Sequence, residues 1–170
     1  MKNKLIVIVG PNASGKSEIA VMIAKKFNGE VVSADSRQVY KGMDIGSGKI
    51  KKSEMKGVPH HLLDVASPKS VFTVTRYRQL ALKAVEKIRR AGKIPTLCGG
   101  TGFYIQAVID GITIPQVKPD WKLRQRLEKL PAKKLYSILR KLDPARAKSI
   151  EAKNPRRLIR AIEIVKTTGK

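Results

Sequence analysis

The chain has 170 residues, with 36 Lys and Arg against 13 Asp and Glu, so its formal net charge is +23 and its pI is about 10.5. Hydrophobic residues make up 42% of the chain, which suits one soluble globular domain with a small appendage. The longest apolar runs, Leu5–Val9 and Ile19–Ala24, are too short to span a bilayer, and the single Cys98 excludes an internal disulfide. We therefore expect a cytoplasmic protein without a membrane anchor.

The positive charge is densest in the C-terminal third. Residues 112–170 carry 17 basic and 5 acidic side chains, a net charge of +12 out of the total of +23. Such a surface binds nucleic acid without reading its sequence, because each neutralised phosphate releases counterions. A high net charge also serves solubility alone, so a polyanionic partner is favoured while that alternative stays open.

Taken in chain order, the first elements alternate between strand and helix. The run Leu5–Val9 is short, apolar and β-branched, which is typical of a strand covered on both faces. Apolar spacing and turn residues extend this pattern and predict strands at 5–9, 30–33 and 94–98 and helices at 17–27, 73–91 and 102–109. The alternation predicts an α/β fold, a parallel sheet flanked by helices, with the functional site at the carboxyl ends of the strands.

The character of the sequence changes after Gly111. Prolines divide residues 112–152 into short helical stretches, which we interpret as a small basic helical insertion. Asp120, Asp143 and Asn154 occupy positions suited to helix N-caps. Residues 153–170 then form a last helix, which we expect to return to the core of residues 1–111, so that the chain makes one compact unit.

The segment between the first strand and the first helix matches the phosphate-binding pattern G-x-x-x-x-G-K-[ST]. Its glycines let successive backbone N–H groups point at phosphate oxygens, and the helix N-terminus adds partial positive charge. Lys16 supplies a further charge, and the Ser17 hydroxyl is suited to bind Mg²⁺. The predicted diphosphate site therefore consists of Gly10, Pro11, Asn12, Ala13, Ser14, Gly15, Lys16 and Ser17.

This P-loop does not define the reaction, since a diphosphate comes from ATP or from another donor. P-loop ATPases place an acidic residue at the end of a neighbouring strand to help hold Mg²⁺. Here the strand ending at Cys98 runs into Gly99–Gly102 without an acid, which weakens the case for an ordinary NTP hydrolase. Asp35, after the second strand, is the acid best placed to reach the loop.

Five segments together resemble the tRNA dimethylallyltransferase family, also called tRNA isopentenyltransferases. They occur in the order typical of the family and span nearly the whole chain. The second of them, Ser33-Ala-Asp-Ser-Arg-Gln-Val-Tyr-Lys-Gly-Met-Asp-Ile-Gly46, is highly specific, whereas the P-loop alone is not. The others are the P-loop itself, Pro59-His-His-Leu-Leu-Asp64, Gly99-Gly-Thr-Gly-Phe-Tyr104 and Asn154-Pro-Arg-Arg-Leu-Ile-Arg-Ala-Ile-Glu163.

The resemblance implies a P-loop NTPase-like core and a prenyl transfer that uses Mg²⁺. The exocyclic amine of the adenosine 3′ of the anticodon in tRNA attacks dimethylallyl diphosphate, and diphosphate leaves. Asp35 accepts the amine proton and Thr101 holds a donor phosphate oxygen. The expected tRNA contacts are Asp35, Ser36, Arg37, Gln38, Thr101, Arg124, Arg156, Arg157, Leu158, Ile159 and Arg160. We expect a monomer.

Each of these residues also has a plain structural alternative. Asp35 could cap a turn, Thr101 could be the N-cap of the helix after it, and Arg156 and Arg160 could form a solvated helix face. Relatives in that family generally continue past Lys170, so the chain resembles a reduced enzyme or a fragment. A small-molecule or nucleotide kinase and a tRNA-binding relative without catalysis remain the alternative functions.

Overall fold

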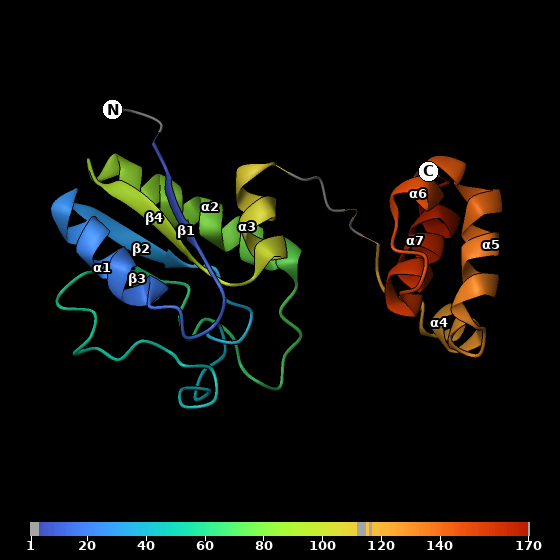
Figure 1. Cartoon of the computed structure of the whole chain (residues 1–170), viewed down its shortest axis with the longest axis horizontal. Coiled ribbons are helices and arrows are strands. Elements are labelled where there is room, and N and C mark those ends of the chain that lie inside the picture. Colours follow the sequence, from blue (N-terminus) through green and yellow to red (C-terminus); the bar gives the residue numbers. More distant parts are fainter. Residues whose placement is uncertain (1–3, 112–114, 116, 170) are drawn as a thin grey trace. The chain divides into compact units, whose positions relative to one another are not determined.

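The computed structural model describes residues 4–111, 115 and 117–169. The chain divides into two compact units, Met1–Thr113 and Ile114–Lys170 (Figure 1). The predicted boundary after residue 111 lies close to this division. Each unit has its own hydrophobic core, so each is described by itself.

The first unit is built on a parallel sheet of four strands in the order β1-β4-β2-β3. Strand β4 lies between β1 and β2, and its register pairs Leu97 with Val7 on one side and with Val32 on the other. Parallel pairing brings the carboxyl ends of β1, β4 and β2 to the same edge. The strands are β1 (Ile6–Val9), β2 (Gly29–Ser33), β3 (His60–His61) and β4 (Ile94–Gly99).

Helices cover both faces of this sheet. Alternate residues of β2 and β4 point to opposite faces, so Val31 and Cys98 pack in a cluster with α1 (Lys16–Lys26), whereas Val32 and Leu97 pack with α2 (Val74–Arg90) and α3 (Gly102–Ile109). Figure 1 shows α1 on one side of the strands and α2 on the other. The predicted α/β fold, with a P-loop NTPase-like parallel sheet flanked by helices, is confirmed.

The second unit consists of helices around a core of leucine and isoleucine side chains. Asp120, Asp143 and Asn154 cap α4, α6 and α7, each through a side-chain oxygen that accepts a backbone N–H three residues later, which confirms the predicted caps. The helices are α4 (Trp121–Glu128), α5 (Ala132–Leu142), α6 (Pro144–Ser149) and α7 (Pro155–Thr168).

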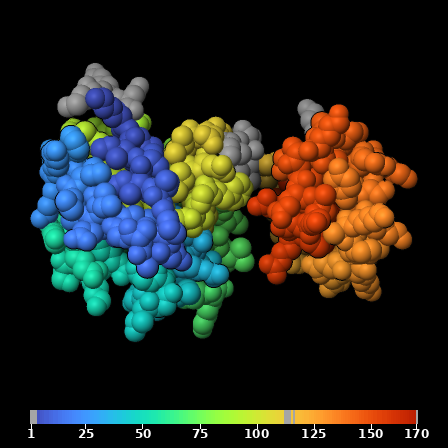
Figure 2. Space-filling model, in the orientation of Figure 1, coloured from blue at the N-terminus to red at the C-terminus, as the bar shows by residue number. Residues whose placement is uncertain are grey.

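Helix α7 belongs to the same core as the preceding helices. Its buried residues Leu158 and Ile162 pack in one cluster with Leu135 and Leu139 of α5, and Figure 2 shows these two helices, in red and orange, packed against each other. Inside this unit α4 and α5 cover the apolar stripe of α7, and the predicted division into an insertion at 112–152 and a last helix at 153–170 stays a prediction. The predicted return of α7 to the first unit stays a prediction. Among the described residues, no helix is both long and apolar enough to cross a bilayer.

Candidate active site

The P-loop forms a tight turn between β1 and α1. Ala13 and Gly15 both have positive φ, 58° and 75°, and Gly15 is the N-cap of α1. Within the described chain no side chain caps this helix, so the N–H groups of its first turn are free to receive an anion. The loop from Pro11 to Gly15 is exposed, as expected of a site that receives a substrate.

Two side chains of the P-loop turn inward onto the loop itself. Lys16 donates from Nζ to the carbonyl of Pro11 over 2.6 Å, and Ser14 donates from Oγ to the same oxygen over 2.9 Å. Cys98 Sγ lies 3.5 Å from the Lys16 carbonyl, which anchors the start of α1 to β4. Ser17 is half-buried in the first turn. The lysine ammonium and the free helix N-terminus thus lie in one short loop.

A magnesium ion fits this loop only if the substrate provides most of its ligands. The described residues contain no cluster of three His, Cys, Asp or Glu side chains that could hold a metal. Mg²⁺ is commonly bound through one or two protein oxygens together with phosphate oxygens and water. The Ser17 hydroxyl beside a bound diphosphate suits that donor set.

The ends of three strands meet at the segment that follows β4. Gly99 must be glycine, because a Cβ there would lie 2.2 Å from the Ala34 carbonyl oxygen at the end of β2. A Cβ on Gly100 would lie 3.3 Å from the Gly10 carbonyl oxygen and 3.5 Å from Asn12 Oδ1. Gly99 and Gly100 therefore let the chain pass close to both β2 and the P-loop. This role was missed from the sequence, although two adjacent glycines directly after a buried strand signal a close backbone approach.

Asp35 and Thr101 lie on the two sides of this junction. Thr101 Oγ1 accepts a hydrogen bond from the Ser36 backbone N–H over 3.0 Å, and the Thr101 N–H donates to the Ala34 carbonyl over 3.1 Å. Asp35 Oδ1 accepts from the N–H groups of Arg37 and Gln38, over 2.8 and 3.3 Å. Among the described residues, no hydrogen bond reaches the other oxygen, Asp35 Oδ2.

These contacts show how far the structural alternatives account for Asp35 and Thr101. Asp35 does cap a turn, but with one oxygen only, so Oδ2 stays available for chemistry. Thr101 occupies the N-cap position of α3, yet its side chain bonds to Ser36 and not to the first turn of that helix. Both side chains are half-buried at the carboxyl ends of adjacent strands.

A pair of buried tyrosines supports the Asp35 turn. The Tyr77 and Tyr104 rings stack with centroids 3.8 Å apart, and Tyr77 donates its hydroxyl proton to the Ser33 carbonyl over 3.0 Å. Burial, with smaller contributions from Tyr40 and Asp35, raises the pKa of Tyr104 to about 12, so its phenol stays neutral. Nothing in the local pattern of either tyrosine had indicated this support.

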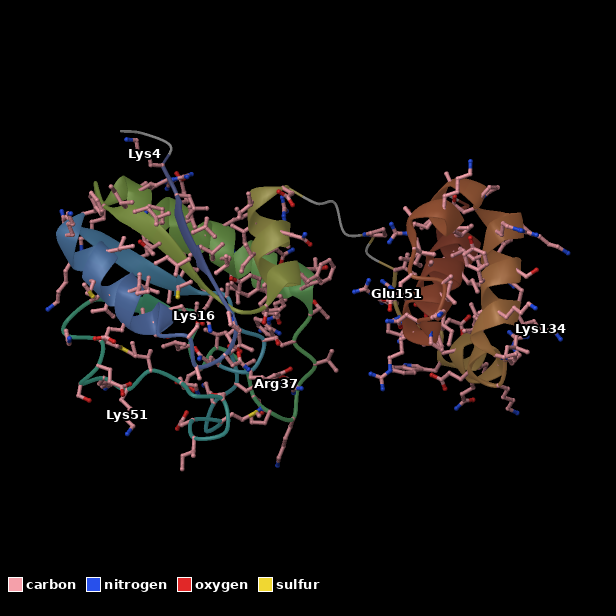
Figure 3. The ribbon with its side chains drawn as sticks, viewed as in Figure 1. Lys4, Lys16, Arg37, Lys51, Lys134 and Glu151 are labelled. Atoms are coloured by element: carbon pink, nitrogen blue, oxygen red, sulfur yellow. The ribbon has the colours of Figure 1, made fainter. Side chains whose placement is uncertain are left out.

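The turn is also tied to the loop that follows it. The Gln38 side chain donates from Nε2 to the carbonyls of Ser47 and Gly48, and its N–H is held by Asp35. Lys49 completes this loop, because its buried ammonium donates to Asp44, to Asp64 and to the Tyr40 carbonyl. Figure 3 shows Arg37 and Lys16 toward the same end of the first unit, whereas Lys4 lies at the opposite end.

His60, His61 and Cys98 have structural surroundings. His61 Nε2 lies 2.6 Å from Glu30 Oε2, and His60 Nδ1 lies 2.9 Å from the Val58 carbonyl oxygen. Burial lowers the pKa of His60. Burial also raises the pKa of the Cys98 thiol to about 11, so the thiol remains protonated at neutral pH. The His61–Glu30 contact joins β3 to β2, and the other two side chains contact backbone carbonyls.

The expected RNA-contacting residues of α7 differ in their surroundings. Arg156 and Arg157 are exposed, and Arg157 Nη1 lies 3.4 Å from Glu151 Oε2. Leu158 and Ile159, in contrast, are buried in the core of the second unit. Their side chains are covered by neighbouring helices, so the expectation that they contact tRNA is corrected for these side chains.

Arg160 and Arg124 are also not simply solvated. Both guanidinium groups pair with Glu163, which is fully buried. Burial alone would raise the pKa of Glu163, but hydrogen bonds from Arg124, Arg160 and the Asp120 N–H outweigh it and lower this pKa to about 2. The alternative of a solvated helix face is thus wrong for Arg160. The sequence signal for this cluster was a lone acid between Ile162 and Ile164.

Comparisons with known proteins agree with the geometry. A profile of the IPP transferase family matches residues 38–170. A tRNA dimethylallyltransferase of Halalkalibacterium halodurans is 47% identical over 174 residues, covering 100% of this chain and 55% of the relative. One from Roseiflexus sp. is 47% identical over 170 residues, covering 98% of this chain and 56% of the relative.

Solved structures give the same result. The full-length tRNA isopentenylpyrophosphate transferase of Bacillus halodurans is 46% identical with a TM-score of 0.67, and the alignment covers 99% of this chain and 57% of that one. A eukaryotic dimethylallyltransferase acting on tRNA is 34% identical with a TM-score of 0.82, and the alignment covers 99% of this chain and 43% of that one. The chain spans about half the length of the curated relatives it matches. Over the whole of its own length it belongs to the IPP transferase family, the tRNA dimethylallyltransferases.

Proposed function

We propose that this protein transfers a dimethylallyl (isopentenyl) group from dimethylallyl diphosphate to N6 of the adenosine 3′ of the anticodon in tRNA, releasing diphosphate. One observation carries the proposal: Gly100 and Thr101 bring the P-loop and the Asp35 turn to one edge of the sheet. A site for the leaving diphosphate and a site for the attacking amine are thereby adjacent. Family membership supports the same reaction and does not favour a small-molecule kinase.

The P-loop residues Gly10–Ser17 bind the diphosphate of the donor. The free N–H groups at the start of α1 and the Lys16 ammonium stabilise the negative charge that develops as the bond between the allylic carbon and its phosphate oxygen breaks. Thr101 holds a phosphate oxygen beside the reacting carbon. Mg²⁺, held by the Ser17 hydroxyl and the diphosphate, supplies further charge neutralisation when bound.

The Asp35 turn receives the target base. The adenosine has to leave its stack to enter such a site. Asp35 Oδ2 accepts the proton of the exocyclic amine as the new C–N bond forms, while Oδ1 keeps the turn in place. Ser36, Arg37 and Gln38 then contact the tRNA around that base.

The excess of positive charge supports binding of the remainder of the tRNA. Arg156 and Arg157 present exposed guanidinium groups for phosphate contacts, and Arg124 and Arg160 belong to the same unit. A monomer acting in the cytoplasm completes the proposal, in keeping with the single buried Cys98.

The test is one incubation with unmodified tRNA, labelled dimethylallyl diphosphate or labelled ATP, and Mg²⁺. We expect label from the prenyl donor in tRNA, and none from ATP. Phosphate transferred from ATP to an acceptor would overturn the proposal in favour of a kinase. Retention of tRNA without label would overturn it in favour of a tRNA-binding protein without catalysis.

A further inference from the structure

Glu163 is an acidic side chain buried inside the basic second unit. Its exposed fraction is 0%, and it lies on α7 beside Ile162 in the core of that unit. Oε1 accepts from Arg124 Nε over 2.9 Å and from the Asp120 N–H over 2.7 Å. Oε2 accepts from Arg124 Nη2 over 2.7 Å and from Arg160 Nη1 over 2.6 Å. The carboxylate therefore joins the start of α4 to the middle of α7.

Because both arginines share Oε2, their guanidinium groups are held side by side. Two like charges at this separation repel each other, and the carboxylate between them offsets that repulsion. The pair together with Glu163 has a net charge of +1. Arg160 Nη1 also donates to the Val117 carbonyl over 3.1 Å, and the Arg124 guanidinium lies 5.3 Å from the centre of the Trp121 ring. Each guanidinium is thus oriented by at least two independent contacts.

Both arginines keep an outward edge. Their side chains are 24% and 35% exposed, for Arg124 and Arg160 respectively, although the carboxylate that they share is fully buried. A guanidinium has five N–H donors, and these contacts use two of them in Arg124 and two, both on Nη1, in Arg160. Among the described residues the other donors of the two groups have no hydrogen-bond acceptor, which leaves them to a ligand at the surface. A phosphate group, with several acceptor oxygens, is the ligand that two adjacent guanidinium groups suit best.

We propose that Glu163 is a positioning residue that holds Arg124 and Arg160 as a preorganised pair for a backbone phosphate of the bound RNA. This inference rests on the proposed function, because it takes tRNA to be the ligand. Rigid presentation removes the entropy cost of ordering two long side chains when the RNA binds. The buried Glu163 carboxylate therefore acts on RNA binding through the two arginines that it orients at the surface.

The direction in which RNA affinity changes when the negative charge of Glu163 is removed tests this inference. Glu163→Gln removes a negative charge from a polyanion-binding protein, so simple electrostatics would make RNA binding tighter. If Glu163 positions the arginines, binding weakens instead, by about tenfold. The slope of log K against log salt should then flatten by about one unit for each RNA phosphate that the protein no longer neutralises. Glu151→Gln is the matched control, since Glu151 is exposed on the same unit and pairs with Arg157.

A second pair of variants keeps the charge constant and covers the case in which Glu163→Gln fails to fold. Arg124→Lys retains the charge but removes the two-pronged contact with Glu163, and it should weaken RNA binding several-fold. Arg126→Lys, on the exposed face of the same helix, should leave binding within twofold of the parent. Circular dichroism identifies the variants that fold.

The measurement is titration of fluorescently labelled tRNA with the full chain at several salt concentrations, followed by prenyl transfer. Tighter binding by folded Glu163→Gln, or equal binding by Arg124→Lys and Arg126→Lys, overturns the inference. A parent that binds tRNA without prenyl transfer overturns the proposed function alone. A parent that does not bind tRNA overturns both.

Discussion

The Thr101 hydroxyl accepts a hydrogen bond from the Ser36 backbone N–H over 3.0 Å, across 65 residues of sequence. This bond joins the carboxyl ends of β4 and β2, which are neighbours in the sheet. It places Thr101 between the P-loop and the Asp35 turn, so that one side chain contributes to the geometry of both. Removing the hydroxyl should therefore disturb both halves of the site.

Thr101→Val should lower prenyl transfer by roughly tenfold or more, because valine has the same shape but no hydroxyl to hold Ser36 or a phosphate oxygen. A factor of ten corresponds to about 1.4 kcal/mol, the usual size of one missing hydrogen bond. Thr101→Ser keeps the hydroxyl and should remain within a few-fold of the parent. Single-turnover prenyl transfer measures both, and equal rates in the two variants would remove Thr101 from the site.

Asp35→Asn should reduce turnover by roughly 10²–10⁴-fold, the range typical of a positioned acid–base group. Asparagine Oδ1 still accepts from the N–H groups of Arg37 and Gln38, so the turn should keep its conformation. Donor affinity should change little, because in the proposed reaction the P-loop, and not Asp35, binds the diphosphate. Prenyl transfer at saturating tRNA and donor, with circular dichroism as the control, tests this; a variant within a few-fold of the parent limits Asp35 to capping the turn.

Lys16→Ala should weaken binding of the diphosphate donor and spare the affinity for tRNA. Lys16 Nζ is directed at the inside of the P-loop, where it contacts the Pro11 carbonyl, and Lys16 is not among the residues expected to bind tRNA. Calorimetric titration with dimethylallyl diphosphate and Mg²⁺ measures the first affinity, and tRNA titration the second. Unchanged donor affinity would contradict the P-loop assignment. Lys134→Ala, an exposed lysine of α5, is the control that should leave donor binding unaltered.

Acid should destabilise the second unit through Glu163. The pKa of this carboxyl is lowered from 4.5 to about 2 in the folded chain, so the unfolded chain binds its proton more readily. The stabilisation is therefore complete above about pH 4.5 and disappears as the pH falls toward 2. Thermal unfolding followed between pH 6 and 2 should show a steeper fall in stability in the parent than in Glu163→Gln. Parallel curves would show that the ion cluster contributes nothing to acid stability.

Elements that depend on residues close together in the chain were predicted correctly, because their interactions are local. The conformation of the P-loop follows from its sequence pattern, because the glycine that the pattern requires at Gly15 allows the positive φ with which α1 begins. Asp120, Asp143 and Asn154 each cap a helix by accepting a hydrogen bond from the backbone N–H three residues later. Such caps can be predicted from the sequence, because Asp and Asn precede the start of a helical pattern. The positions of β1, β2 and β4 followed from apolar spacing for the same reason, whereas the short strand β3 (His60–His61), which has no apolar run, was missed.

Patterns within short segments were enough to predict the α/β class, to locate the P-loop pattern and to find the resemblance to one family. The part that each charged residue plays depended instead on the tertiary structure. Arg124 and Glu163 are 39 positions apart, and although an acid between Ile162 and Ile164 hints at burial, the local patterns do not reveal that Arg124 is its partner. Gly99 and Ala34 likewise meet only because β4 lies beside β2 in the sheet. Strand order and helix packing bring these distant residues together, and both result from the folding of many segments, so no single segment of the sequence reveals the contacts.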